Sequence, residues 1–139
     1  MDYLNKSTLF MLYIKSFGIW FILAGSAIVV AAFRVGVLLP ALGEQTAHQL
    51  GTILYLIVQF AIIFFFIKKM KIKKIKTLFG IGIFWVVITI IFEFVFGHYV
   101  MGHSWQKLFA DYNLLNGRLW VLVLINNIAA PLISRKIIE

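Results

Sequence analysis

The sequence predicts an all-α, integral membrane four-helix bundle, and its composition is the first reason. Of the 139 residues, 63% are hydrophobic and only 13% are charged, and the mean hydropathy is +0.99. A soluble domain of this size does not bury that much apolar surface. Four stretches approach the about 20 apolar residues that a helix needs to cross about 30 Å of hydrocarbon. They lack the polar alternation of membrane β-strands.

The four predicted spans form a single domain, residues 1–139. They lie at residues 11–33, 50–67, 78–96 and 112–133. The first is interpreted as a retained helix and not as a secretory signal, because its apolar run from Phe17 to Phe33 is longer than a signal core and further spans follow. The fourth is extended back beyond Leu119, because Leu119 to Ile133 is too short to span alone and Asp111 suits an N-cap.

The connection between the first two spans, Arg34 to Thr52, carries residues that disturb helices. Pro40 disfavours helical backbone at Leu39, and Gly36 and Gly43 flank it. We therefore expect a bent loop or a short interfacial helix in this connection.

Lysines dominate the connection between the second and third spans. The segment KKMKIKKIK holds six of them, which are Lys68, Lys69, Lys71, Lys73, Lys74 and Lys76. The two terminal segments add two basic residues each, so ten of the thirteen basic residues lie on this side of the predicted bundle. Short loops rich in lysine and arginine stay in the cytoplasm, which predicts an N-in/C-in protein of the inner (cytoplasmic) membrane. The lysines are expected to attract anionic lipid headgroups, and no nucleic-acid partner is predicted.

The other side of the predicted bundle carries most of the remaining polar and charged residues. We expect a small-ligand or ion site there, with the candidate residues Arg34, Glu44, His48, Glu93, His98, His103, Asp111, Asn113 and Arg118. Glu93 and Arg118 are each seventeen residues from a basic residue at the inner end, and so lie at matching depth. An isolated charge near hydrocarbon is costly, so these two are predicted to form an ion pair between the third and fourth spans.

Three side-chain amides are predicted near the middle of the membrane, at Gln59, Asn126 and Asn127. A helical rise of about 1.5 Å per residue puts Gln59 and Asn126 about 13 Å from their cytoplasmic ends. Amides at this depth usually hydrogen-bond to neighbouring helices, which favours a structural role. A conduction path or a ligand contact is the alternative.

A divalent metal is the cofactor that the polar residues suggest. The candidate ligands would suit zinc, manganese or iron, and they are Glu44, His48, Glu93, His98 and His103. Glu44 and His48 are four apart and would share one helix face, which suits two metal ligands and equally suits an ordinary surface pair. His98 and His103 are five apart, which matches no compact zinc motif. The chain has no cysteine, which excludes disulfides and thiolate metal sites.

Catalysis by the same residues is a further interpretation. The sequence contains no nucleophile elbow, Gly-rich phosphate loop or paired-carboxylate signature. Either His98 or His103 has the chemistry of a general acid or base. Either Arg34 or Arg118 has the geometry to hold a lipid phosphate.

Several short elements of the sequence resemble an uncharacterised family of short bacterial four-span integral membrane proteins. These elements are GHY, GHSW, DYN and GRLW, together with the earlier PALGEQTAHQLGT. The resemblance runs from about Arg34 to Pro131, and it implies a bacterial origin and the same four-span fold without an established activity. The family commonly has an acidic residue after the arginine of the first connection. Val35 follows Arg34 here, so an ion pair of that acid is missing or replaced.

A transporter or channel-like function is the first hypothesis that these features support. Four short spans enclose little volume, so a transport path is expected to need a homo-oligomer. One alternative is a membrane-bound enzyme that acts on a lipid headgroup or small amphiphile, and another is an accessory subunit of a larger membrane complex. Transport predicts a water path that reaches Gln59 and Asn126, whereas an enzyme needs only a pocket with an acid or base facing it.

Overall fold

The computed structural model describes residues 6–110 and 120–138, and these residues form helices and no strand. The elements in chain order are α1 (Lys6–Phe33), the π-helix η1 (Arg34–Leu38), α2 (Leu39–Leu42), α3 (Glu44–Met70), α4 (Ile75–Val95), the π-helix η2 (Phe96–Val100), α5 (Trp105–Ala110) and α6 (Trp120–Ile138). Four helical segments are long and apolar enough to cross a membrane: α1 continued through α2, α3, α4 continued through η2, and α6. The all-α class with four long apolar helices is therefore confirmed.

The long helices extend beyond the predicted spans. α3 begins at Glu44 and ends at Met70, whereas its apolar run covers only residues 50–67. The apolar run marks the part that hydrocarbon would cover, and polar residues continue the helix at both ends. Glu44 in the first turn and Lys68 and Lys69 in the last turn have the charges that the helix dipole favours.

The other three helices also differ from their predicted bounds. α1 begins at Lys6 and α4 at Ile75, both earlier than predicted, and α6 continues to Ile138 instead of ending at residue 133. The predicted start of the fourth span, at residue 112, lies outside the described residues.

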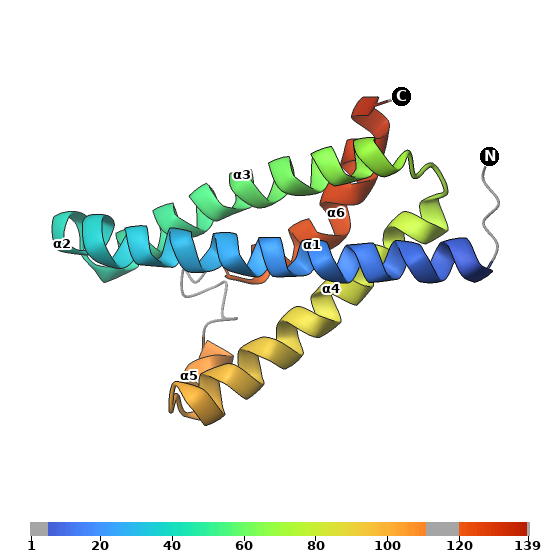
Figure 1. Cartoon of the computed structure of the whole chain (residues 1–139). Coiled ribbons are helices and arrows are strands. Elements are labelled where there is room, and N and C mark those ends of the chain that lie inside the picture. The colour runs from blue at the N-terminus through green and yellow to red at the C-terminus, as the bar shows by residue number, and fades with distance from the viewer. Residues whose placement is uncertain (1–5, 111–119, 139) are drawn as a thin grey trace.

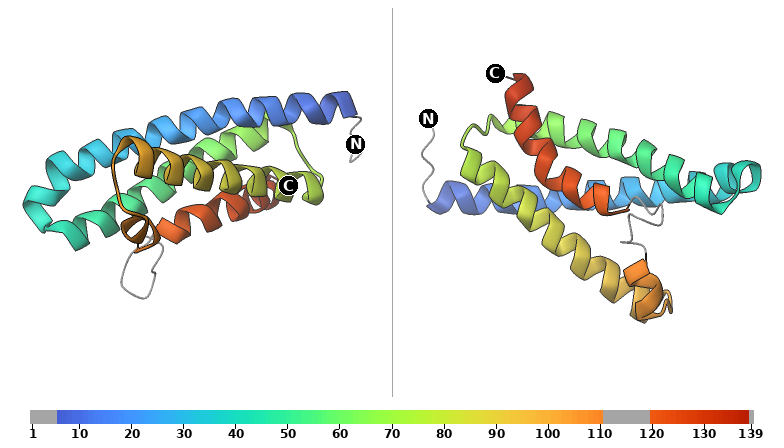
Figure 2. Two further views of the ribbon diagram at one scale, coloured as in Figure 1. Left: turned by 90° about the horizontal axis from the view of Figure 1, so that it is seen from below. Right: turned by 180° about the vertical axis from the view of Figure 1, so that it is seen from behind.

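The helices pack in the order α1, α3, α6, α4 around the bundle. α6 contacts both α3 and α4, while α1 contacts α3 and, less extensively, α4. Figure 2 shows α6 crossing between α3 and α4 on the side away from α1. α6 therefore holds together two helices that a short connection joins at only one end.

The bundle has two different ends (Figure 1). The start of α1, the end of α6 and the α3–α4 connection lie together, and we call this the lysine end because it carries residues 68–76. α2 and α5 lie toward the opposite end, here called the α2–α5 end. α1 and α3 run beside each other along their length, whereas α4 diverges from α1 toward α5 (Figure 1).

The hydrophobic core fills the half of the bundle near the lysine end. Its members include Leu12, Ile63, Phe66, Ile67, Leu78, Ile81, Trp85 and Ala130. The Trp85 Nε1–H donates to the carbonyl of Ser16 at 2.9 Å, and the Trp20 Nε1–H donates to Thr89 Oγ1 at 2.9 Å. Both bonds therefore join α1 to α4.

The first connection differs from the sequence prediction at Leu39. This residue is helical, with φ −62° and ψ −49°, and the backbone stays helical from Arg34 to Leu42. Pro40 lies in the first turn of α2, where its missing N–H is tolerated, and the wider π turn of η1 precedes it. The chain bends at Gly43, whose φ of 85° suits glycine. Of the two expected forms, the short helix is the one observed.

Candidate functional site

A cavity of about 330 Å³, here called the main cavity, lies among the helices on the side toward the α2–α5 end. Five predicted site residues from five different segments line it, namely Arg34, Gln59, Glu93, His103 and Asn127. Their segments are η1, α3, α4, the η2–α5 connection and α6. The fold thus brings predicted residues from both connections and the mid-helix amides to one space.

Arg34 is held at one end of the main cavity by α3. Its Nη1 donates to Nδ1 of the buried His48 at 3.3 Å. A guanidinium can only donate, so Nδ1 is the acceptor and the imidazole is neutral. The contact therefore orients the positive charge of Arg34 without neutralising it.

Gly51 gives the Arg34 side chain its room. A Cβ at this position would lie 3.2 Å from Arg34 Cδ and 3.3 Å from Cγ, so the arginine stem packs directly on the α3 backbone. Arg34 and His48 also line a smaller cavity of about 70 Å³ between α1 and α3. Arg34 therefore lies between the two cavities.

His103 and His98 belong to one turn but have different surroundings. The His103 N–H donates to the Gly97 carbonyl at 2.9 Å, and His98 Nδ1 donates to the His103 carbonyl at 2.9 Å. The His98 ring also stacks on Trp105, with centroids 3.7 Å apart. His103 lines the main cavity, whereas His98 closes the turn that presents it.

The three predicted amides join α3 to α6 at the other end of the main cavity. Gln59 Nε2 donates to Asn127 Oδ1 at 2.5 Å, and Asn126 Nδ2 donates to Gln59 Oε1 at 2.8 Å. Gln59 and Asn127 are almost fully buried and line the main cavity. These hydrogen bonds join two helices, and the side chains of Gln59 and Asn127 also face the space that a ligand would occupy.

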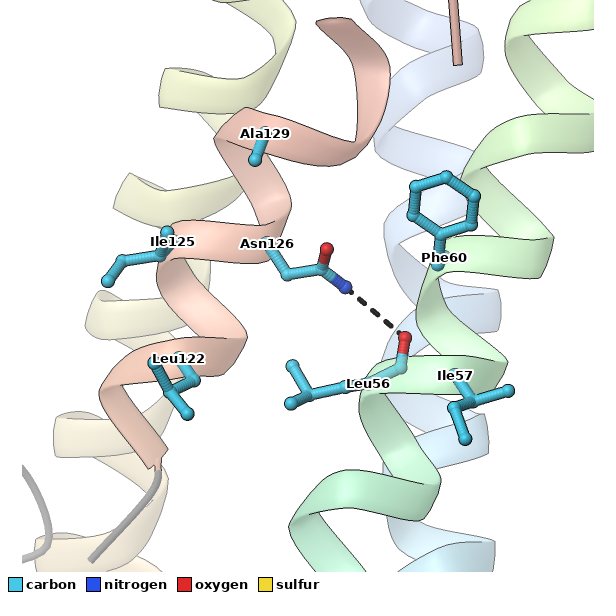
Figure 3. A pocket seen from close by; sticks show the side chains of 7 residues that line it. All are labelled: Leu56, Ile57, Phe60, Leu122, Ile125, Asn126 and Ala129. Carbon is cyan, nitrogen blue, oxygen red and sulfur yellow. Dashed lines mark hydrogen bonds between the residues drawn. The ribbon is translucent and has the colours of Figure 1, made fainter. Parts of the chain in front are cut away.

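Asn126 faces the outside of the bundle and not the main cavity. It lines an open, apolar groove of about 460 Å³ between α3 and α6, whose other residues are Leu56, Ile57, Phe60, Leu122, Ile125 and Ala129 (Figure 3). Its Nδ2 also donates to the Leu56 carbonyl at 3.3 Å. Gln59 and Asn126, which transport predicts a water path to reach, thus line different spaces, the main cavity and the outer groove.

The remaining predicted residues that the structure describes do not assemble as a metal site. Glu44 is exposed at the start of α3, one turn before His48. Within residues 6–110 and 120–138, no three His, Asp or Glu side chains are grouped as a metal ion would need. Asp111, Asn113 and Arg118 lie outside the described residues, and with them the predicted ion pair of Glu93 and Arg118.

Tyr55 and Thr89 line the main cavity but are not among the predicted site residues. The Tyr55 hydroxyl donates to the Leu23 carbonyl at 2.8 Å, which joins α3 to α1. A signal for Tyr55 exists in the sequence, because His48, Thr52, Tyr55 and Gln59 recur every three or four residues in an apolar helix. All four are buried, so this polar stripe marks the inward face of α3.

A second polar pocket lies at the lysine end. It has a volume of about 320 Å³, and its basic lining residues are Lys68, Lys71, Lys73 and Arg135. Arg135 Nε donates to the Lys73 carbonyl at 2.6 Å, which ties the end of α6 to the α3–α4 connection.

Comparisons of the chain with protein-family models, with curated proteins and with solved structures give no match. The functional argument therefore depends on the cavities and on the residues that line them.

Proposed function

We propose that the protein is a multi-pass protein of the bacterial inner membrane, N-in/C-in, that binds a small ligand or ion in the main cavity and acts as a transporter or channel-like protein. The observation that carries the proposal is the main cavity itself, which extends from Arg34 and His103 to Gln59 and Asn127. Its volume of about 330 Å³ lies in the range of about 300–1,000 Å³ that is common for small-molecule sites.

The lining has the composition of a ligand site. Most of it is apolar, and a few polar groups converge from different helices: a guanidinium, a carboxylate, an imidazole and two amides. Ionisable groups within a membrane span are costly and commonly mark a substrate or ion path. Arg34 and Glu93 in one cavity are therefore a reason to propose binding and not merely packing.

The cavity is closed toward the lysine end, so transport requires a second conformation. The core there contains fully buried side chains, those of Ile63, Leu78, Ile81 and Trp85. The Gln59–Asn127 bond lies between this core and the main cavity. In the proposed mechanism this amide pair is the barrier, and it separates when the second conformation opens.

Pro131 gives α6 a weak point next to this barrier. A proline inside a helix removes the hydrogen bond to the carbonyl four residues earlier, which is that of Asn127. The helix can therefore bend where the barrier amide is attached. The predicted homo-oligomer remains part of the proposal, because a path past the packed half of one chain could lie between copies.

Accessibility to a charged, membrane-impermeant thiol reagent tests the proposal, since the chain has no cysteine of its own. Thr89→Cys lines the main cavity, Ile63→Cys lies in the core, and Ile57→Cys is 64% exposed on the outer flank of α3. In membranes, only Thr89→Cys is expected to react, because hydrocarbon excludes the reagent from Ile57 and packing excludes it from Ile63. A Thr89→Cys protein that reacts no faster than Ile57→Cys from either side of the membrane would contradict the proposal.

A membrane-bound enzyme is the second candidate, and one observation favours it. Glu93 and His103 both line the main cavity, and a carboxylate with an imidazole has the acid and base chemistry needed for headgroup hydrolysis or transfer. Chemical change of a defined lipid by the purified protein, lost in His103→Gln, would select this candidate over transport.

A further inference from the structure

We infer that the main cavity is entered sideways from the membrane, between α1 and α4, by a single-chain amphiphile whose anionic head lies at Arg34. This inference rests on the proposed function, because it requires that the bundle spans a membrane and that the main cavity is its ligand site. It adds the class of ligand and the route of entry.

The route follows from where α1 and α4 are joined. The Trp20–Thr89 hydrogen bond of 2.9 Å and the packing of Trp20 on Phe92, with ring centroids 5.3 Å apart, are contacts between these helices at one end of the main cavity. Beyond them α4 diverges from α1 toward α5 (Figure 1). The main cavity occupies the space between the two helices on that side.

The residues at this opening are apolar and face outward as well as inward. Ile28 of α1, Phe92 of α4 and Phe96 of η2 line the main cavity, yet 66%, 41% and 40% of their surfaces are exposed. Between Leu23 and Arg34, the other α1 residues that line the cavity have small side chains, Ala24, Ala27 and Ala31. An opening of this kind on a membrane-spanning flank faces acyl chains, and its walls would suit an apolar chain.

The dimensions favour one chain over larger occupants. Leu23 and Arg34 both line the cavity and are eleven residues apart along helical backbone, or about 16 Å, which is about the depth of one leaflet. A protein helix about 10 Å across and of that length would occupy roughly 1,200 Å³. A cavity of about 330 Å³ is too small for such a helix, and a single hydrocarbon chain fits it better.

The positive charge of Arg34, at the end of the main cavity away from the lysine end, favours an anionic headgroup. Arg34 is oriented by His48 and by the α3 backbone at Gly51. Guanidinium donors in a fixed fork suit carboxylate and phosphate oxygens. At leaflet depth this places an anionic head at the membrane surface and its chain along Ala31, Ala27 and Ala24.

Photolabelling in lipid nanodiscs tests this inference on the full chain. The probe is a hexadecanoic acid that carries a diazirine on its chain, in nanodiscs of phosphatidylcholine and phosphatidylglycerol, and adducts are mapped by mass spectrometry. Adducts are expected on residues 24–31 and 89–96. Ala27→Phe is expected to lower them at least fivefold by filling the cavity, and Ala31→Leu is expected to do so in part. The matched control Ala32→Phe, exposed on the same helix, is expected to leave them unchanged.

The head is tested with Arg34→Gln and two probes. Labelling by the fatty acid is expected to fall about tenfold, which is the scale of one hydrogen bond to a charged group, while labelling by the matching fatty alcohol stays the same. Equal losses with both probes would remove the assignment of an anionic head.

Two outcomes overturn the lateral route and are distinguishable from failure of the proposed function. Adducts confined to outer positions such as Ile57 and Ile125, or equal labelling of Ala27→Phe and Ala32→Phe, show that the probe does not enter. If Thr89→Cys still reacts with the aqueous reagent, the cavity is a site for a water-soluble ligand and only the present inference fails. If Thr89→Cys is also unreactive, both proposals fail.

Discussion

At Gly82 the backbones of α4 and α6 approach so closely that no larger residue fits. A Cβ there would lie 2.8 Å from the Asn127 carbonyl oxygen and 2.8 Å from Ile128 Cα, both of which are backbone atoms. This contact presses α4 against α6 where the Gln59–Asn127 bond joins α6 to α3. One glycine thus helps to hold three helices together at the closed end of the main cavity.

Gly82→Ala is therefore expected to destabilise the protein by about 1–3 kcal/mol, the usual cost of overpacking a filled core. Thermal unfolding of the purified protein in detergent measures the change. Gly25→Ala is the matched control, because nothing lies within 4 Å of a Cβ at that position of α1. The control should be neutral or slightly stabilising, since alanine favours helix by up to about 1 kcal/mol. Equal unfolding temperatures for the two variants would contradict the close approach of α4 and α6.

At the scale of elements, sequence reasoning identified helices better than their junctions. The four apolar helices followed from hydropathy, because each apolar run reports where a helix has to be buried. The helical state of Leu39 did not follow, since the rule for residues before proline describes isolated backbone and not a π turn that runs into a second helix. The divergence of α4 could not be predicted either, because it depends on contacts such as Trp20–Thr89 between residues 69 positions apart.

The candidate site was predicted in part for the same reason. Helical rise predicted that Glu93 lies toward the outer end of its span and that the amides lie near the middle of theirs. Three of these residues, Glu93, Gln59 and Asn127, line the main cavity. Rise along a helix says nothing about rotation around it. Asn126 and Asn127 are neighbours in sequence, yet one faces the outer groove and the other the cavity.

The lysines around the α3–α4 connection predict that the lysine end prefers anionic lipid. Lys68, Lys71 and Lys73 line one pocket with Arg135, and a lysine near an anionic membrane surface contributes about 1 kcal/mol of attraction. Replacing these three lysines by glutamine is expected to lower the number of phosphatidylglycerol molecules retained in native mass spectrometry, and salt is expected to weaken the retention.

The control for this experiment removes the same charge elsewhere at the lysine end. Lys6, Lys15 and Lys136 do not line the pocket, and their joint replacement by glutamine should retain more phosphatidylglycerol than the pocket variant. If the two triple variants lose lipid equally, the lysines act only as a diffuse positive surface.

At the scale of the whole molecule, the two ends of the bundle differ in chemistry. The lysine end is basic and packed, whereas the α2–α5 end contains the main cavity and most of the acidic and imidazole groups that the structure describes. A bundle with this asymmetry would cross a membrane in one direction, because positively charged connections are retained in the cytoplasm. The direction decides which compartment the main cavity faces.

Single-cysteine labelling determines this direction. Lys73→Cys is exposed in the α3–α4 connection, and Gln106→Cys is exposed in α5, at opposite ends of the bundle. In intact cells, an impermeant thiol reagent is expected to modify Gln106→Cys and to leave Lys73→Cys unmodified until the membrane is permeabilised. The parent chain, which has no cysteine, sets the background. Labelling in the reverse order would make the main cavity face the cytoplasm, so that the amphiphile inferred to enter between α1 and α4 would come from the cytoplasmic leaflet.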